Sequence, residues 1–261
     1  MASFSTPQVY IEQFNPKEYL QEYYSEEDGV LLADWVDFTL RNLNDTFTKG
    51  GVGGNTLLDF GTGPTIYQLL SACEAFDKII ASDFLEQNRA EIRKWLRNDP
   101  DAFDWTHLIN FVCDVEKNGD DAEQKSETLR NTVKQVMKCD VHKKNPYDPI
   151  VMPPVDCLLS CLCLEFSCKD MYTFTEVLKN LQALIKPGGY FLIFGVLSCS
   201  FYYVGEKRFT SLPLKQEELE MAFYKSGYVI EKNVYAPRTD MSTLEISDFD
   251  NMYYIRAKKP K

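Results

Sequence analysis

The segment LLDFGTGPTIYQLL, Leu57 to Leu70, constrains the fold of this chain more than any other part of its 261 residues. An apolar run leads into two glycines, Gly61 and Gly63, and a proline then precedes a second apolar stretch. That order predicts a strand, a tight turn and the N-terminus of a helix over 64–73. Glycine lets a backbone approach a ligand closely, and the first N–H groups of a helix are free to bind it. The turn therefore predicts a site for a nucleotide-like molecule.

Apolar strands alternate with amphipathic segments after a mostly helical stretch that ends at GGVGG. The pattern predicts strands at Thr56–Phe60, Asp77–Asp83, Leu108–Asp114, Val155–Leu162, Tyr190–Leu197, Tyr228–Tyr235 and Met252–Lys258. It predicts later helices at Pro64–Cys73, Glu86–Asn98, Ala122–Met137, Asp170–Lys186 and Glu217–Lys225. Apolar strands alternating with helices indicate an α/β fold whose mostly parallel sheet is covered on both faces. We expect one domain, 1–261, with a helical cap over 1–50 and a cofactor-binding core over 51–261.

The composition excludes several classes of partner. A formal net charge of −11 argues against nucleic acid and acidic membranes, which bind cationic surfaces. The longest apolar run, Tyr190–Leu197, is far shorter than the ~20 residues of a membrane helix. The N-terminus lacks a basic segment followed by an apolar one, so we expect a cytoplasmic protein with its eight cysteines reduced. The cysteine spacing is not that of a zinc site, and we expect no metal and a monomer.

The identity of the nucleotide-like ligand stays open on the glycine turn alone. A dinucleotide-binding turn needs a third glycine, and Ile66 stands at that position. Asp83 ends the second strand, where an acid accepts hydrogen bonds from ribose hydroxyls. This pair fits S-adenosylmethionine as well as it fits NAD, with NAD disfavoured by Ile66. The alternative is a plain strand–helix turn with a surface aspartate.

Longer motifs carry a resemblance that covers nearly the whole chain. The segments are FNPKEYLQEYY, DFGTGPTIYQLLSA, SDFLEQNRAEIRKWL, DAFDW, KCDV, LCLE, LIKPGG and YYVGEKRF. In this order they resemble the family of small-molecule N-methyltransferases that includes the nicotinamide, indolethylamine and phenylethanolamine enzymes. SDF…NR…KWL and KCDVHKKNP are most similar to the indolethylamine branch. The resemblance implies a Rossmann-like S-adenosylmethionine-dependent methyltransferase fold, with a mostly parallel seven-stranded sheet and an N-terminal helical lid.

The same resemblance implies a set of contacts to S-adenosyl-L-methionine. These are Tyr19, Tyr24 and Tyr67 around the methionine end, Gly61, Thr62 and Gly63 beneath it, Asp83 and Asn88 at the ribose, Asp140 and Val141 at the adenine, and Cys161 near the sulfonium. Aromatic faces suit a sulfonium cation, at about 0.5–2 kcal/mol each. Without the resemblance, the tyrosines of 16–24 indicate only an ordinary amphipathic helix.

Glu165 is the candidate catalytic residue. It follows the strand predicted to end near Leu162, and a carboxylate near the attacking nitrogen would accept its proton or stabilise the developing charge. The alternative is a helix-cap or surface acid. The resemblance implies a substrate pocket of Tyr19, Leu162, Glu165, Gly195, Cys199, Tyr202, Ser211 and Asp248.

Two positions bear on the substrate. In the nicotinamide enzyme an aspartate implied to hold the carboxamide stands at the position of Gly195, and in the phenylethanolamine enzyme a glutamate stands at Cys199. These departures favour methylation of an arylalkylamine such as tryptamine. Nicotinamide methylation, thioether S-methylation and a cofactor-binding protein without catalysis remain as alternatives.

Overall fold

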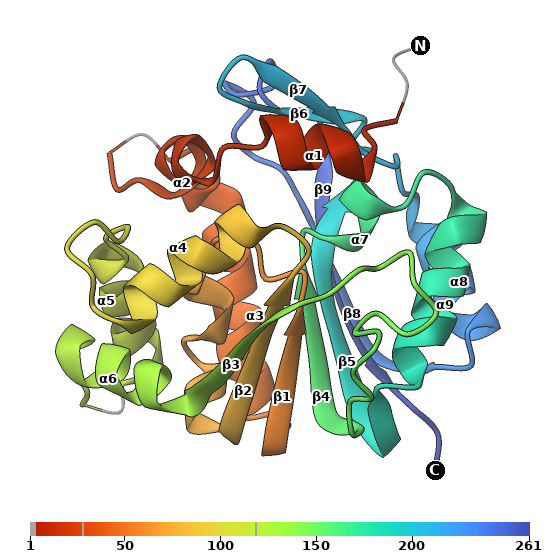
Figure 1. The fold of residues 1–261 in the computed structure, drawn as a ribbon, viewed down its shortest axis with the longest axis horizontal. Coiled ribbons are helices and arrows are strands. Elements are labelled where there is room, and N and C mark those ends of the chain that lie inside the picture. Colours follow the sequence, from red (N-terminus) through yellow and green to blue (C-terminus); the bar gives the residue numbers. More distant parts are fainter. Residues whose placement is uncertain (1–3, 28, 118) are drawn as a thin grey trace.

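The computed structural model describes residues 4–27, 29–117 and 119–261 (Figure 1). Over these residues the main sheet has seven strands in the order β3–β2–β1–β4–β5–β9–β8. The strands are β1 (Gly54–Phe60), β2 (Phe76–Asp83), β3 (Val133–Lys138), β4 (Val155–Cys161), β5 (Ile185–Leu197), β8 (Val229–Pro237) and β9 (Asn251–Lys258). Strand β9 pairs antiparallel with both of its neighbours, and the other pairings are parallel. A second sheet is the hairpin of β6 (Phe201–Val204) and β7 (Lys207–Thr210).

Helices cover both faces of the main sheet (Figure 1). They are α1 (Pro7–Gln13), α2 (Pro16–Tyr24), α3 (Asp37–Phe47), α4 (Glu86–Leu96), α5 (Thr106–Glu116), α6 (Ala122–Thr132), α7 (Leu164–Ser167), α8 (Met171–Gln182) and α9 (Gln216–Lys225), with short turns η1 (Leu32–Val36), η2 (Tyr67–Leu69) and η3 (Ala72–Glu74). Successive strand residues face opposite sides, so Leu57 belongs to one buried cluster and Leu58 to the other. Both faces of β1 are therefore in the core, as its apolar sequence predicts.

Two predicted elements near the middle of the chain are wrong. The segment Leu108–Asp114, predicted as a strand, lies in helix α5. Its buried residues Leu108, Ile109 and Val112 follow a helical spacing, but a segment of seven residues is too short to distinguish that spacing from the pattern of a buried strand. The helix predicted over Ala122–Met137 ends at Thr132, and the remaining residues belong to β3. This short edge strand carries lysine and glutamine, so its alternation of apolar and polar residues is weak.

The helix predicted over Pro64–Cys73 is also wrong, because only η2 and η3 form there. Side chains bond the local backbone instead. Thr65 Oγ1 donates to Thr62 O at 2.9 Å, and Gln68 Nε2 donates to the same oxygen at 3.2 Å. Such bonds compete with the helical ladder. The helix predicted over Asp170–Lys186 is the shorter α8, and KPGG lies within β5.

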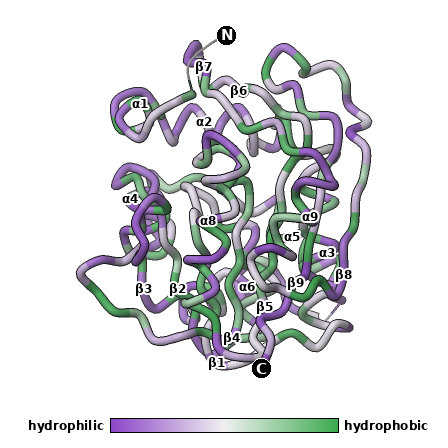
Figure 2. The backbone as a smooth tube through the Cα atoms, turned by 90° about the vertical axis from the view of Figure 1, so that its right-hand side faces the viewer, coloured by the Kyte–Doolittle hydropathy of each residue, from purple (hydrophilic) through white to green (hydrophobic). Residues whose placement is uncertain are grey.

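Helices α1 and α2 and the β6–β7 hairpin gather at the carboxyl end of the parallel strands. Figures 1 and 2, a quarter-turn apart, both place them together at the end of the molecule opposite the C-terminus. Ser5 N–H donates to Thr210 Oγ1 at 2.6 Å, and Thr210 N–H donates to Ser5 Oγ at 3.0 Å. Tyr23 Oη donates to Tyr203 O at 2.6 Å. Bonds across about two hundred residues of sequence thus fix the start of the chain to the hairpin.

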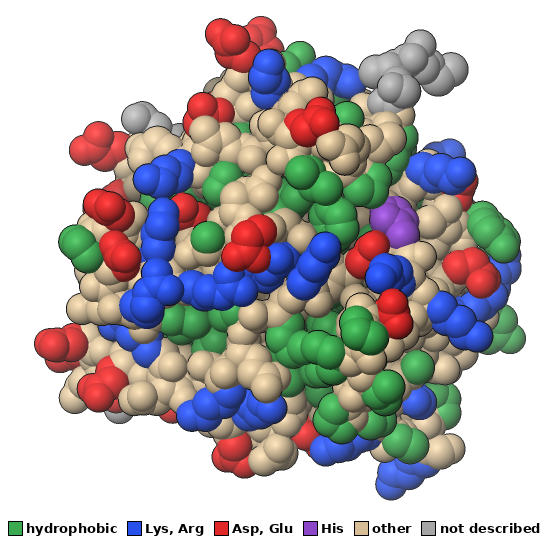
Figure 3. Space-filling view, viewed as in Figure 1, with side chains coloured by type: hydrophobic (Ala, Val, Ile, Leu, Met, Phe, Trp, Pro, Cys, Tyr) green, Lys and Arg blue, Asp and Glu red, His purple; other side chains and the backbone are tan. Residues whose placement is uncertain are grey.

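The surface carries its charges unevenly. Figure 3 shows a band of Lys and Arg side chains across the face that holds α4. On α4 the cations have acidic partners, with Arg93 bonded to Glu86 at 2.7 Å and Lys94 to Glu91 at 2.7 Å. No helix among the described residues is both long enough and apolar enough to cross a bilayer. In the same part of the chain, no group of three His, Cys, Asp or Glu residues is arranged to hold a metal ion.

Candidate active site

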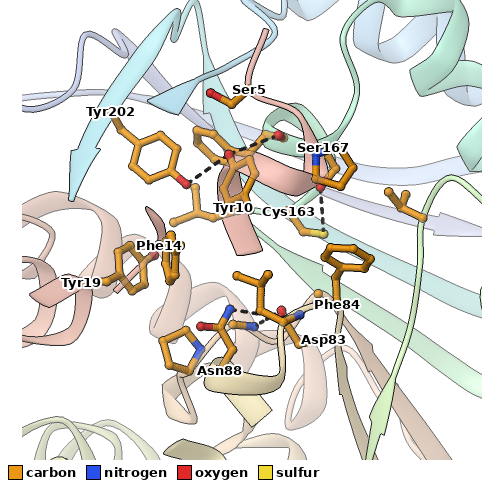
Figure 4. Close-up of a pocket in the computed structure, with 18 of the residues that line it drawn as sticks. Ser5, Tyr10, Phe14, Tyr19, Asp83, Phe84, Asn88, Cys163, Ser167 and Tyr202 are labelled. Atoms are coloured by element: carbon orange, nitrogen blue, oxygen red, sulfur yellow. Dashed lines mark hydrogen bonds between the residues drawn. The ribbon is translucent and has the colours of Figure 1, made fainter. Parts of the chain in front are cut away.

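A cavity of about 170 Å³ lies beyond the carboxyl ends of β1, β2 and β4, beneath α1 and the hairpin (Figure 4). Its lining comes from the ends of these strands, from α1 and α2 and from the loop after β3. It includes Ser5, Tyr10, Phe14, Tyr19, Tyr23, Gly61, Gly63, Asp83, Phe84, Asn88, Cys139, Asp140, Val141, His142, Leu162, Cys163, Phe166, Ser167, Val196, Tyr202, Ser247 and Phe249. This is the place in an open α/β sheet where ligands bind.

The glycine turn borders the cavity, but its N–H groups are not free. Gly61 N–H and Thr62 N–H both donate to Ser82 O, at 2.8 and 2.9 Å. Gly63 N–H donates to Asp83 Oδ2 at 2.9 Å. The expectation of free donors at a helix N-terminus is therefore wrong, because the turn is bonded to β2. Gly61 has φ +75° and a Cβ there would lie 2.1 Å from Cys163 Sγ, so close packing requires the glycine.

Asp83 joins three segments at the floor of the cavity. Besides Gly63, its carboxylate accepts Leu85 N–H at 2.8 Å and Asn88 Nδ2 at 3.0 Å. Burial raises the pKa of Asp83, and these bonds to the backbone and to Asn88 act in the opposite direction. The amide oxygen of Asn88 is buried and has no hydrogen-bond partner. The floor thus offers a buried carboxylate and an unpaired acceptor to a ligand with hydroxyl donors.

Aromatic rings form the opposite side of the cavity, which we call the roof, defined as Tyr10, Phe14, Tyr19 and Tyr202. Figure 4 shows these rings across the cavity from Asp83 and Asn88. Tyr202 Oη donates to Tyr10 Oη at 3.2 Å. The ring centroids of Phe14 and Tyr19 lie 5.3 Å apart. Burial raises the pKa of Tyr19 to about 12, so its hydroxyl is neutral at physiological pH.

The charge of the lining selects the charge of a ligand. Asp83 and Asp140 contribute carboxylates, whereas no Lys or Arg occurs among the described residues that line the cavity. Aromatic faces and carboxylates both attract cations. The arrangement therefore favours a ligand that carries positive charge and an apolar body.

Glu165 lies below the cavity rather than on its lining. Its side chain is fully buried, and its Oε1 accepts Val196 N–H at 3.0 Å. Its Oε2 has no hydrogen-bond partner. Burial raises the pKa of Glu165 from 4.5 to about 7. Val196 lines the cavity, so one backbone group separates the carboxyl from the ligand space.

Of the residues expected from the resemblance, the lining brings together Tyr19, Gly61, Gly63, Asp83, Asn88, Asp140, Val141, Leu162 and Tyr202. Tyr24 and Tyr67 lie behind Tyr19. Tyr19 Oη and Tyr24 Oη are 3.3 Å apart, and Tyr67 Oη accepts Trp35 Nε1–H at 2.9 Å. Thr62 is buried under the turn. Cys161 ends β4, where its buried thiol keeps its proton because burial raises its pKa.

The remaining predicted substrate residues also lie outside the lining. Cys199 and Ser211 are buried, with the Cys199 thiol 3.6 Å from Ser247 Oγ. Asp248 accepts Ser200 N–H at 2.7 Å and Phe201 N–H at 3.1 Å, which fixes the start of the hairpin. Gly195 lies in β5 beside the Glu165 carboxyl. The prediction that these residues bind substrate stays a prediction.

Sequence reasoning missed part of the lining, chiefly Ser5, Tyr10, Phe14, Phe84, Cys139, His142, Cys163, Phe166, Ser167, Val196, Ser247 and Phe249. A signal for α1 was present, because Thr6 caps the helix through Val9 N–H and Pro7 stands at its first position. Tyr10 and Phe14 then follow at the spacing of one helical turn. His142 borders the cavity from the loop after β3.

Comparison with known proteins identifies the family. The model of the NNMT/PNMT/TEMT family matches residues 2–260. Nicotinamide N-methyltransferase from Homo sapiens is 44% identical over 236 residues, which cover 88% of each chain. The chain belongs to the NNMT/PNMT/TEMT family. This family member is also similar to indolethylamine N-methyltransferase from Oryctolagus cuniculus, at 43% identity over 90% of each chain. The expected resemblance and the assignment as a methyltransferase are confirmed, whereas these identities do not separate the branches.

Solved structures confirm the fold of this NNMT/PNMT/TEMT family member. The N-methyltransferase NodS from Bradyrhizobium japonicum, in complex with S-adenosyl-L-homocysteine, matches with a TM-score of 0.53 at 8% identity, over 94% of this chain and 98% of that one. The CurJ carbon methyltransferase matches with a TM-score of 0.56 at 11% identity, over 97% of this chain and 64% of that one. The Rossmann-like S-adenosylmethionine-dependent methyltransferase fold predicted from the sequence is therefore correct.

The buried carboxyl of Glu165 makes stability depend on pH. The folded protein binds its proton more tightly than the unfolded chain, so this carboxyl lowers stability as pH rises from 4.5 to about 7. Glu165→Gln removes the ionisation. We expect the variant's advantage in unfolding free energy to grow through that window and to reach about 3 kcal/mol above it.

Urea unfolding at a series of pH values measures this difference. The control is Glu176→Gln, on the outer side of α8, where the side chain is 45% exposed. Its difference from the wild type should stay near zero throughout. A Glu165→Gln difference that is the same at pH 4 and pH 8 contradicts the buried, protonatable carboxyl.

Proposed function

We propose that this chain transfers a methyl group from S-adenosyl-L-methionine to the nitrogen of a small arylalkylamine, such as an indolethylamine. The cavity beyond β1 and β2 carries the proposal. It combines an acidic floor with an aromatic roof, and its described lining residues include no Lys or Arg. Both the donor's sulfonium and the methylated ammonium product are cations with apolar bodies, which such a lining attracts.

The floor suits the adenosyl part of the donor. Asp83 Oδ2 keeps acceptor capacity beyond its bond from Gly63, whereas Oδ1 already accepts from Leu85 and Asn88, and Asn88 Oδ1 is a buried acceptor without a donor. Two ribose hydroxyls would satisfy these acceptors. Asp140 and Val141 border the same end of the cavity, as expected for residues beside the adenine. The residues present therefore fit the donor.

When bound, S-adenosyl-L-methionine supplies an electrophilic methyl group on a positively charged sulfur. The chain's residues then have two tasks. The roof tyrosines and Phe14 hold the amine's aromatic body in line with that methyl group, which provides the orientation that accelerates a bimolecular displacement. Glu165, with a pKa of about 7, accepts the amine's proton near neutral pH through an intervening water molecule.

Nicotinamide is the second candidate substrate, because the nicotinamide enzyme from Homo sapiens is as similar as the indolethylamine relatives. The glycine at 195 does not exclude it. A Cβ at Gly195 would lie 2.2 Å from Glu165 Oε1, so a carboxylate oxygen already occupies the space beside this glycine. Glu165 is therefore itself an acceptor near the place where the other enzyme has its aspartate. Thioether acceptors and a catalytically silent protein are the further alternatives.

We further propose that residues 1–50 act as a lid on the core formed by 51–261. The support is the position of Tyr10, Phe14 and Tyr19 on the cavity and the bonds of Ser5 to Thr210. Such a lid would exclude water from the reacting groups. The predictions of a monomer, of a small-molecule partner and of a cytoplasmic location rest on the sequence.

A screen of methyl transfer tests the proposed function. Purified protein is incubated with radiolabelled S-adenosyl-L-methionine and, in parallel, tryptamine, nicotinamide or dimethyl sulfide. We expect the largest kcat/KM for tryptamine. A preference for nicotinamide selects the second candidate, and a preference for the sulfide selects thioether methylation. Donor binding in calorimetry without any methylated product overturns the enzymatic proposal.

Glu165→Gln tests the proposed proton acceptor. We expect kcat to fall by at least about tenfold while the Kd for S-adenosyl-L-homocysteine changes less than about twofold, because the amide keeps the bond from Val196 but cannot take a proton. Steady-state kinetics and calorimetry measure the two values. Unchanged amine turnover would remove Glu165 from the reaction.

Asp83→Asn tests the floor. An amide nitrogen in place of one oxygen leaves an N–H of the turn or of Leu85 without an acceptor, so we expect the Kd for S-adenosyl-L-homocysteine to rise by about tenfold or more. Asp77→Asn, at the exposed start of the same strand, is the matched control and should bind normally. Equal affinities in the two variants would contradict the assignment of Asp83 to the donor.

A further inference from the structure

Glycine at 195 leaves a volume that two polar side chains share. Gly195 and Tyr253 are direct partners across the antiparallel pair β5–β9. A Cβ built on Gly195 would lie 2.5 Å from Tyr253 Oη and 2.2 Å from Glu165 Oε1. Both oxygens are therefore close to one point, one from β9 and the other from α7. Any side chain at 195 would separate them.

Neither group has its full set of partners. Tyr253 and Glu165 are completely buried. Tyr253 Oη has no hydrogen-bond partner, and Glu165 has one free oxygen, Oε2, while Val196 N–H occupies Oε1. An unpaired buried polar group is costly, and native proteins rarely keep two in the same place. The two side chains are not hydrogen-bonded to each other in the structure. The Glu165 oxygen beside the shared volume is Oε1, which can accept a second donor besides Val196 N–H, and Tyr253 Oη is placed to supply it.

The two groups are complementary as donor and acceptor. Burial raises the pKa of Tyr253 well above its usual value, so its hydroxyl keeps a proton to donate. The titratable groups close enough to Glu165 to feel its charge are Tyr19, Cys161, Cys163, Cys168, Cys199 and Tyr253. Burial raises the pKa of every one of them, so they are neutral near pH 7. An ionised Glu165 is therefore surrounded by neutral groups, and the Tyr253 hydroxyl can donate a hydrogen bond to it.

We propose that Tyr253 is a positioning residue for Glu165, and that its hydroxyl donates to the carboxylate across the volume left free by Gly195. The bond orients the carboxylate under Val196 and stabilises its ionised form. The use of that carboxylate as a proton acceptor rests on the proposed function, whereas the bond itself does not. Gly195 then has a role of its own, because it keeps the two oxygens in reach of each other.

Titration of Glu165 in the ligand-free protein tests the bond without any turnover. Carbon-13 NMR of the side-chain carboxyls follows the titration, and the spectrum of Glu165→Gln assigns the signal. Tyr253→Phe removes the hydroxyl alone. We expect its Glu165 midpoint to lie about one pH unit above that of the wild type, because a donor to the charged form lowers a pKa. An unchanged midpoint overturns the proposal.

Tyr254→Phe is the matched control. Tyr254 is the next residue of β9, buried on the opposite face, where its hydroxyl lies 2.6 Å from Thr46 Oγ1. It loses a hydroxyl of the same kind, but the Glu165 midpoint should not move. If Tyr253→Phe does not fold, Gly195→Ala replaces it, because its Cβ would force the two oxygens apart and should raise the midpoint in the same direction. A folded Gly195→Ala protein with the wild-type midpoint also overturns the proposal.

The pH profile of methyl transfer provides the second measurement. For Tyr253→Phe we expect kcat/KM to be about tenfold below the wild type at pH values under both midpoints and equal to it well above them. A structural role alone would lower the rate at all pH values and leave the profile in place. If the wild-type protein transfers no methyl group, the proposed function fails, while the NMR titration still decides whether Tyr253 binds Glu165.

Discussion

The site depends on the carboxylate of Asp83. It binds the N–H of Gly63 from the turn after β1, the N–H of Leu85 and the side chain of Asn88 from α4. These bonds fix the glycine turn against β2 and set the floor of the cavity. Because the turn's own donors are used internally, the floor presents acceptors to a ligand. This explains how a strand–turn motif that resembles an anion-binding loop can instead receive a ligand through its hydroxyl groups.

Much of the fold could be predicted from the sequence, because long apolar strands such as β5 and strongly periodic helices such as α8 carry clear patterns. The errors arose in segments too short for the helical and the strand repeat of apolar residues to be told apart. Leu108–Asp114 is too short to show its helical repeat, and β3 is a polar edge strand joined directly to α6. Around Gln68, side-chain bonds to the backbone replaced the expected helix, and such bonds leave no periodic signal.

The site was predictable where one motif contributes a contact and less so where the fold brings distant segments together. Gly61 and Asp83 follow from motifs at strand ends, and Asn88 follows from the family resemblance. Tyr10 contributes to the roof only because the first residues of the chain return to the β6–β7 hairpin, and no local pattern records that contact. The same holds for Tyr253, which meets Glu165 only through the pairing of β5 with β9. Contacts of this kind depend on which residues pair between neighbouring strands, and a single sequence does not reveal that register.

The attachment of Ser5 to Thr210 affects how ligands enter and leave the cavity. Two backbone-to-hydroxyl bonds join Ser5 to Thr210 at the end of β7, and the hydroxyls of Tyr10 and Tyr202 meet from the two sides. Helix α1 and the hairpin are therefore joined by hydrogen bonds. In the lid proposed for residues 1–50, withdrawal of α1 from the cavity breaks these same bonds, so ligand exchange would be coupled to a small set of contacts made by Ser5 and Tyr10.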